Sequence, residues 1–315
     1  MSPRISPTAL LLATGAALPQ ARADHAPPAA PGRVAFEDSS RSAEPAAVAE
    51  LPPLPPAAPP RTSPAPRFQL AIGPYTATRT LTFDVAASTA ADALPATSPE
   101  ATVGGLGVAA AVYPAGGRDA RGRLVGPGIV VGFRHSLGAT AAFVDPDTDE
   151  AVELPAVDSQ LTVGLGYRQP LGPALVELVI AHQRDSHRID ERPPWLELPD
   201  ADYRAVAVTA RVEAQPRGRT TVAVAAGYAY VLDAGELMAP DGYGAGTVRA
   251  YQLAAGVDVP LARALFASAS LTYRHTALAF DGDGALTTLD DADVPDVYGA
   301  VDQQVDAQVA VGVRY

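Results

Sequence analysis

Apolar and polar residues alternate strictly along the last fifteen residues of the chain. One face of this extended segment would carry Val305, Ala307, Val309, Val311, Val313 and Tyr315. The opposite face would carry Gln304, Asp306, Gln308, Ala310, Gly312 and Arg314. A side-chain period of two with unlike faces predicts a β-strand between two different surroundings. Because the chain ends on an aromatic residue of the interfacial type, we expect the apolar face to meet lipid.

Similar segments of about ten residues recur from Arg67 onward, which is typical of transmembrane β-strands. The clearest cover residues 160–168, 176–183, 206–212, 221–230, 251–258 and 265–274. Weaker segments cover residues 106–112, 129–133 and 68–72. The segment that begins at residues 68–72 either continues through Thr78 or leaves residues 81–85 as a separate piece. With the terminal segment, the sequence predicts about ten strands, within a range of about 8–12.

The predicted connections alternate in length. Short ones, rich in the turn formers Pro and Gly, cover residues 169–173, 215–218 and 260–262, and residues 114–122 form a longer turn at the same end. Long ones cover residues 136–157, 187–201, 233–246 and 278–300. A secreted β-sandwich also has short strands, but each strand then needs a dry face covered by a second sheet. We therefore expect an all-β, up-and-down antiparallel transmembrane β-barrel.

Composition excludes several classes of protein. Hydrophobic residues make up 48% of the chain, yet no segment beyond the N-terminus reaches the roughly 20 apolar residues of a membrane-spanning helix. The absence of cysteine excludes disulfides, thiol catalysis and thiolate metal sites. The net charge of -12 argues against nucleic acid as a partner.

Two segments are expected to precede the barrel. Residues 1–23 have the features of a signal peptide, with Arg4, an apolar run over residues 9–18 and the small residues of Ala21-Arg22-Ala23. Residues 24–66 are rich in Pro and Ala and are expected to be a disordered linker. This linker is a periplasmic spacer, a proline-rich ligand, or a leader without a role of its own. The barrel then occupies residues 67–315.

Charged side chains occur at intervals on the polar faces of the predicted strands. The candidates for lining the lumen are Arg168, Glu177, Arg211, Asp258, Arg274, Asp306 and Arg314. About ten strands enclose an interior close to the size that side chains fill. The charges therefore either pair in a closed lumen, which we favour, or line a thin water path.

Tyrosines lie toward strand ends on the apolar faces. The candidates for aromatic girdles at the membrane interfaces are Tyr167, Tyr228, Tyr230, Tyr251, Tyr273 and Tyr315. A register slip of one residue would instead place some of them in the lumen.

Carboxylates are concentrated in the predicted long loops. They comprise Asp145, Asp147, Asp149, Glu150, Asp185, Asp190, Glu191, Asp281, Asp283, Asp290, Asp291, Asp293 and Asp296. Such clusters could bind divalent cations that bridge to anionic surface lipid. A solvated acidic surface is the interpretation we favour, and no other cofactor is expected.

Histidine and hydroxyl residues provide weak candidates for catalysis. They are His135 with Ser136, His182, Ser186 with His187, and His275 with Thr276. Adjacent residues of a strand point to opposite faces, which makes poor catalytic pairs. We expect no enzyme.

From about Arg67 to Tyr315 the chain resembles the general class of bacterial outer-membrane β-barrel proteins. The resemblance implies a Gram-negative outer membrane, contact with lipid and lipopolysaccharide, and recognition of Val311, Val313 and Tyr315, with Val305 and Val309, by the barrel-assembly machinery. Similarity to omptin-like proteases extends to strand count alone.

If the short turns lie on the periplasmic side of the outer membrane, both termini lie in the periplasm and the long loops are extracellular. The expected function is a structural or surface role for a monomer. A narrow passive channel for small solutes and a rim hydrolase or acyltransferase are the alternatives.

Overall fold

The computed structural model describes residues 68–85, 98–114, 117–118, 124–145, 148, 150–196, 198–216, 220–287 and 297–315. The predicted signal peptide and the Pro-rich segment lie outside these described residues. No helix among them is long and apolar enough to span a membrane.

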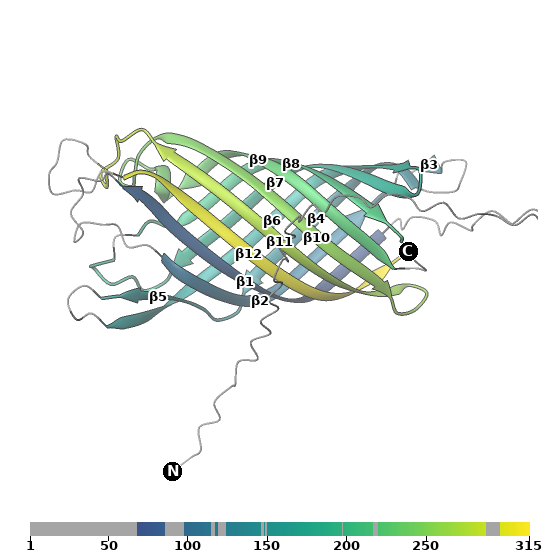
Figure 1. The fold of residues 1–315 in the computed structure, drawn as a ribbon, viewed down its shortest axis with the longest axis horizontal. Helices are drawn as coiled ribbons and strands as arrows, with labels where there is room; N and C mark the ends of the chain where they lie inside the picture. The colour runs from purple at the N-terminus through teal and green to yellow at the C-terminus, as the bar shows by residue number, and fades with distance from the viewer. Residues whose placement is uncertain are drawn as a thin grey trace, which may run out of the picture. The chain divides into compact units, whose positions relative to one another are not determined.

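The described chain is built from antiparallel strands (Figure 1). They are β1 (Phe68–Val85), β2 (Ser98–Val112), β3 (Gly117–Arg118), β4 (Leu124–Ser136), β5 (Ala139–Val144), β6 (Ala151–Leu171), β7 (Ala174–Ile189), β8 (Ala201–Ala214), β9 (Thr221–Gly235), β10 (Gly246–Pro260), β11 (Leu265–Phe280) and β12 (Val297–Arg314). A short 3-10 turn, η2 (Glu236–Met238), follows β9.

The sheet closes on itself because β1 pairs with both β2 and β12. At the seam, the Phe68 and Tyr315 backbones exchange two hydrogen bonds of 3.0 Å. β4 and β5 both lie between β2 and β6 and form one barrel strand, interrupted at Gly138, whose φ is 78°. β3 adds a two-residue pairing with β4. The described residues therefore form a closed barrel of ten strands with one extra short strand, as predicted.

β1 resolves the alternatives that the sequence left open, because it is one continuous strand through Val85. Ile72 points outward and is 55% exposed, whereas Ala77 and Leu81 are buried on the inner face. The apolar residues therefore change faces midway along the strand. This change is what makes residues 81–85 resemble a separate segment in the sequence.

The prediction of a long connection over residues 136–157 was wrong. β5 and the start of β6 occupy most of it, and their pairing continues from Ala139 opposite Ala156 to Val144 opposite Ala151. Asp185, predicted in an acidic loop, lies within β7. The strands are longer than the apolar pattern because backbone groups continue to pair where the outer face becomes polar.

An apolar belt covers the outer face of the barrel. Its exposed aliphatic residues include Ile72, Leu106, Ile129, Leu165, Ile180, Val208, Val224, Leu253, Leu271, Val309 and Val311. These residues alternate with inward-facing ones along their strands, as lipid-facing residues do in membrane barrels.

A second apolar cluster fills the barrel interior at the end where the longer connections lie. It combines inner-face residues such as Leu81, Phe143 and Val297 with Leu198 and Leu237 from the connections. We call this cluster, whose buried members are Tyr75, Ala77, Leu81, Ala101, Val103, Ala139, Ala141, Phe143, Leu154, Ala156, Ile189, Leu196, Leu198, Ala201, Tyr203, Ala234, Leu237, Tyr243, Leu278, Phe280, Val297 and Ala300, the apolar plug.

Aromatic stacking and hydrogen bonds hold the connections in the plug. The ring of Tyr243 lies 4.9 Å from that of Phe83 and 5.1 Å from that of Phe280. The buried Thr287 hydroxyl donates to the carbonyl of Val297 at 2.8 Å and accepts from its amide at 3.1 Å. The connection after β9 and residues 281–287 after β11 therefore fold into the mouth of the barrel.

The connection between β7 and β8 is fixed to η2. Arg192 Nη2 lies 2.7 Å from Asp200 Oδ1 and 3.6 Å from Glu236 Oε2, and the Asp200 amide donates to Glu236 Oε2 at 3.0 Å. Burial raises the pKa of Asp200 above its usual range, although Arg192 opposes this shift. The connection between β7 and β8 is thus joined to the connection between β9 and β10 across the mouth of the barrel.

The substitution Leu237→Ala should test the packing of the apolar plug. Leu237 is 0% exposed, so removing its side chain should leave a cavity and cost roughly 2–5 kcal/mol of unfolding free energy. The measurement is urea unfolding of the protein folded in lipid vesicles. Leu232→Ala is the matched control, because Leu232 is 60% exposed on the outer face of β9. Equal losses in both variants would contradict a packed plug.

Candidate functional site

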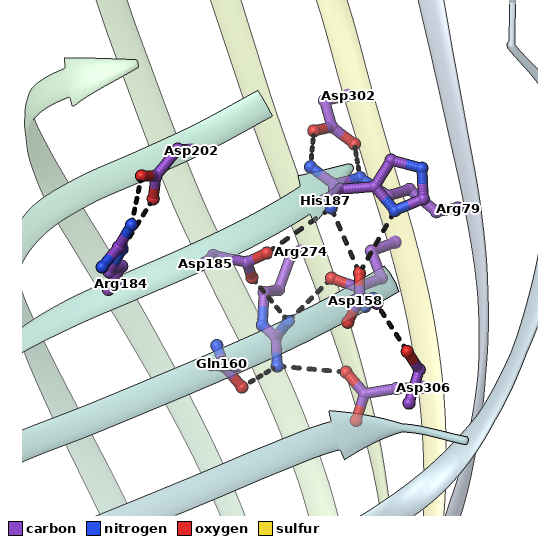
Figure 2. A network of polar contacts seen from close by, with 12 residues as sticks. Arg79, Asp158, Gln160, Arg184, Asp185, His187, Asp202, Arg274, Asp302 and Asp306 are labelled. Atoms are coloured by element: carbon purple, nitrogen blue, oxygen red, sulfur yellow. Dashed lines mark hydrogen bonds and ion pairs between the residues drawn. The ribbon is translucent and has the colours of Figure 1, made fainter. Parts of the chain in front are cut away.

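Below the apolar plug, Arg79 joins carboxylates from three distant strands (Figure 2). Its Nε donates to Asp302 Oδ1 at 3.0 Å, and its Nη1 lies 3.3 Å from Asp158 Oδ2 and 3.5 Å from Asp185 Oδ1. Arg79, Asp158 and Asp302 are each buried. One guanidinium on β1 is therefore surrounded by carboxylates of β6, β7 and β12.

Arg274 on β11 extends this network toward the centre of the barrel. Its Nη1 lies 3.1 Å from Asp185 Oδ2, and its Nη2 lies 3.2 Å from Asp306 Oδ2. It also donates to Gln304 and Gln160, each at 2.7 Å. We call the set Arg79, Arg134, Asp158, Asp185, Arg274, Asp302 and Asp306 the ionic network, because Arg134 also pairs with Asp306.

The network crosses the lumen rather than following its wall. Its ion pairs join β1 to β6 and β7, β11 to β7, and β4 to β12. Strands on opposite parts of the wall are thereby connected at one level. Together with the apolar plug above it, the network fills this half of the interior with side chains.

The lumen is less filled toward the short turns. A cavity of about 360 Å³ is bordered by Arg134, Arg168, Glu177, Arg211 and Arg274, among others. A second cavity of about 160 Å³ is bordered by Arg211, Asp258 and Phe266, among others. The two cavities share Gln69, Ala71 and Gln308. Cavities lined partly by polar side chains therefore lie on the short-turn side of the network.

The predicted lumen candidates fall into separate groups. Arg274 and Asp306 belong to the ionic network. Arg168 lies 3.5 Å from Glu177, over the ring of Tyr113, whose hydroxyl donates to Glu177. Arg211 pairs with Glu213 at 2.9 Å.

Two lumen candidates lie beside the smaller cavity. Arg314 lies over the ring of Phe266 at 4.3 Å, and Asp258 borders the same cavity as Phe266. The structure thus distributes the seven candidates over two levels of the interior. Whether they select a solute stays a prediction.

Sequence reasoning missed Arg79, Arg134, Asp158, Asp185 and Asp302 as lumen residues. Two of them, Asp158 and Asp302, have a detectable signal, because the polar alternation of their own strand reaches them. In β6, Asp158 continues the series Gln160, Thr162 and Gly164. In β12, Asp302 continues the series Gln304 and Asp306. Both residues would have been found by following every second inward position past the point where the apolar alternation on the other face ends.

The tyrosine candidates all have solvent-accessible outer positions in the described chain. Tyr167 and Tyr315 lie near the short turns, and Tyr228, Tyr230, Tyr251 and Tyr273 lie in the middle of the strands or nearer the long connections. Val311 is exposed on the outer face, and Val313 is half-buried. Their roles as girdle and assembly signal stay predictions.

The candidates for catalysis are mostly separated. His135 and His182 are exposed on the outer face, and Ser136 is buried on the inner one. His275 stacks on Tyr251 at 4.8 Å on the outside. His187 points inward, where its Nδ1 lies 3.5 Å from Asp158 Oδ2. The cavity beside His187 measures about 10 Å³, which is too small for a substrate.

The acidic loops are only partly described. Asp147, Asp149, Asp290, Asp291, Asp293 and Asp296 lie outside the described residues. Asp283 accepts a hydrogen bond from the Ala245 amide at 2.8 Å. Within the described ranges, no three His, Cys, Asp or Glu side chains are grouped so that they could hold a metal ion. A divalent cation in these loops stays a prediction.

The substitution Arg79→Met should strongly destabilise the barrel. It leaves the buried carboxylates of Asp158 and Asp302, and the half-buried one of Asp185, without their shared cation, which should cost roughly 3–5 kcal/mol. Urea unfolding in lipid vesicles measures the loss. Arg184→Met is the control, because the Arg184–Asp202 ion pair lies on the exposed face and should contribute at most about 1 kcal/mol. Equal losses would show that the network is not the stronger interaction.

No protein-family model matches the chain, and no curated protein matches it. Solved structures do align with it. The outer-membrane protease OmpT of Escherichia coli shares 6% identity over 79% of this chain and 96% of its own, with a TM-score of 0.40. The β-domain of the Bordetella autotransporter BrkA shares 11% identity over 75% and 98%, with a TM-score of 0.37. OprG of Pseudomonas aeruginosa shares 10% identity over 81% and 98%, with a TM-score of 0.32.

Such low similarities carry no argument about activity. The class follows from the chain's own geometry, which combines a closed antiparallel sheet, an exposed apolar outer face and a polar interior. The chain has the fold of the general class of bacterial outer-membrane β-barrel proteins.

Proposed function

We propose that this protein is a closed outer-membrane barrel with a structural, surface-exposed role. The observation that carries the proposal is the filling of one half of the lumen by the apolar plug and the ionic network. Solute passage would require displacement of packed side chains and separation of buried ion pairs. Both are costly in a low-dielectric interior.

The proposal includes an orientation. Short turns face the periplasm in barrels of this class, so the apolar plug would lie at the extracellular end. The two cavities would then lie on the periplasmic side, and the termini would be periplasmic. The acidic connections would face the lipopolysaccharide surface, and the protein would act as a monomer.

A narrow passive channel is the second candidate function. The cavity of about 360 Å³ supports it, because that cavity is bordered by charged and amide side chains that would solvate a small polar solute. The candidate requires the plug to move. A rim hydrolase has less support, because His187 lies below the plug beside a cavity of about 10 Å³.

Planar-bilayer recording should distinguish a closed barrel from a channel. The wild-type protein should give no steady unit conductance. A variant that combines a short Gly-Ser turn in place of residues 237–243 with Arg79→Ala and Arg274→Ala should conduct, because it lacks Leu237 and Tyr243 of the plug and two cations of the ionic network. Steady conductance by the wild type would contradict closure. A folded, inserted variant that does not conduct would show that these residues are not the barrier.

We also propose that the terminal strand is the signal for barrel assembly. Tyr315 supports this role because its backbone forms the seam with Phe68 while its ring is exposed on the outer face. The strand would thus present its aromatic end before the barrel closes.

Deleting Tyr315 should reduce the amount of folded protein in the outer membrane more than the amount exported. Cell fractionation with detection of the heat-modifiable folded band measures both quantities. Tyr315→Phe is the control, since it keeps the backbone and the ring and should assemble normally. Normal insertion of the deletion variant would refute the proposed signal.

A further inference from the structure

The outer face of the barrel changes from apolar to basic and aromatic across five neighbouring strands, β7 to β11. Arg184 of β7 lies opposite Arg204 of β8, and Tyr230 of β9 lies opposite Arg249 of β10. Tyr251 of β10 lies opposite His275 of β11, with 4.8 Å between the ring centroids. We call Arg184, Arg204, Tyr230, Arg249, Tyr251 and His275 the basic–aromatic patch.

The patch lies at the margin of the apolar belt. Within four residues toward the short turns, the outward positions of the same strands are Ile180, Val208 and Leu253, all exposed and apolar. Arginine is costly in the hydrocarbon core but costs little at its interfaces. The patch therefore lies at the depth of lipid headgroups, on the side of the long connections.

At this level of the barrel, uncharged residues lie on both sides of the patch, and on the β6 side the residue opposite Arg184 is Leu161. Following the register from His275, the next outward residues are Gln303 of β12 and Thr80 of β1, both uncharged. A general attraction to an anionic membrane surface would not require this asymmetry. A local cluster instead fits a ligand that binds at one place.

The arginines exceed the carboxylates that accompany them. Arg184 makes a bidentate contact with Asp202 at 2.9 and 2.6 Å, and Arg204 lies 3.7 Å from Asp202 and 3.8 Å from Asp233. No ion pair of Arg249 is found among the described residues. Arg184 and Arg204 lie directly across a strand pair, where like charges destabilise a sheet, and the two share the single carboxylate of Asp202.

We propose that the basic–aromatic patch binds the phosphorylated headgroup of an anionic glycolipid in the outer leaflet. Guanidinium groups match phosphate oxygens in bidentate geometry, and tyrosine rings sit well between acyl chains and a polar headgroup. Arg204 and Arg249 are two strands apart and are also offset by two residues along the strands, because Arg249 lies opposite Tyr230 and Tyr230 lies opposite Val206. This places them about 12 Å apart. That spacing suits a headgroup carrying more than one phosphate. The inference rests on the orientation proposed above.

The test measures binding of bisphosphorylated lipid A to the full-length protein folded in zwitterionic detergent, by titration with native mass spectrometry. Arg249→Gln should weaken binding roughly tenfold, which is the loss of about one charge-assisted hydrogen bond. The double variant Arg204→Gln, Arg249→Gln should lose more. If the double variant does not fold, binding by Arg249→Gln alone tests the proposal. This single variant should fold, because the Arg249 side chain makes no ion pair within the described residues.

Arg263→Gln is the matched control. It removes the same charge from the exposed turn between β10 and β11, at the opposite end of the barrel, and should leave binding unchanged. Two further probes test the ligand chemistry. Dephosphorylated lipid should bind roughly tenfold or more weakly, and inorganic phosphate at the same concentration should not displace lipid A.

Each contrary result overturns the proposal. Unchanged binding in Arg249→Gln would remove the patch as the site, and an equal loss in Arg263→Gln would indicate net charge alone. Equal binding of dephosphorylated lipid would exclude phosphate recognition, and displacement by inorganic phosphate would exclude a lipid source. A conducting wild-type barrel would refute the closed lumen and leave these binding results unaffected.

Discussion

The structure depends on the constraint that every backbone amide and carbonyl facing lipid must be paired within the sheet. An open sheet would leave two edges unpaired, so β1 must meet β12. The two hydrogen bonds between Phe68 and Tyr315 and the register from Leu70 opposite Val313 onward meet this requirement. Closure then fixes which residues face lipid and which share the narrow interior.

The narrow interior explains why buried charge and apolar packing occur together. A barrel of ten strands has room for side chains but little more. Near the long connections the inner face is apolar, and Leu237 and Tyr243 can complete a dry cluster. Below it, Arg79 and Arg274 are surrounded by carboxylates that would be costly to bury alone. On the short-turn side, the interior instead contains a cavity lined partly by polar side chains.

The fold was largely predictable because membrane strands have a strict period of two. Residues 305–315 showed both faces directly, and the terminal strand lies where the pattern placed it. β1 was harder, since its apolar residues change faces between Ile72 and Leu81. That change follows from the apolar plug, which depends on residues far apart in sequence.

The ionic network was less predictable than the strands. Arg79 meets Asp302, which lies 223 residues further along the chain, so no local pattern pairs them. Asp185 was placed in a loop, and Asp158 lay outside the predicted strand, because apolar alternation weakens near both residues while strand pairing continues. The charged positions near the short turns, such as Arg168 and Glu177, were found because their strands are apolar on the other face.

Liposome swelling with small solutes tests the central claim of a closed lumen most directly. Vesicles containing the folded wild-type protein should swell no faster than protein-free vesicles in isosmotic solutions of glycine or arabinose. Swelling that increases with the amount of folded protein, and that is faster for the smaller solute, would show an open water path and contradict the account.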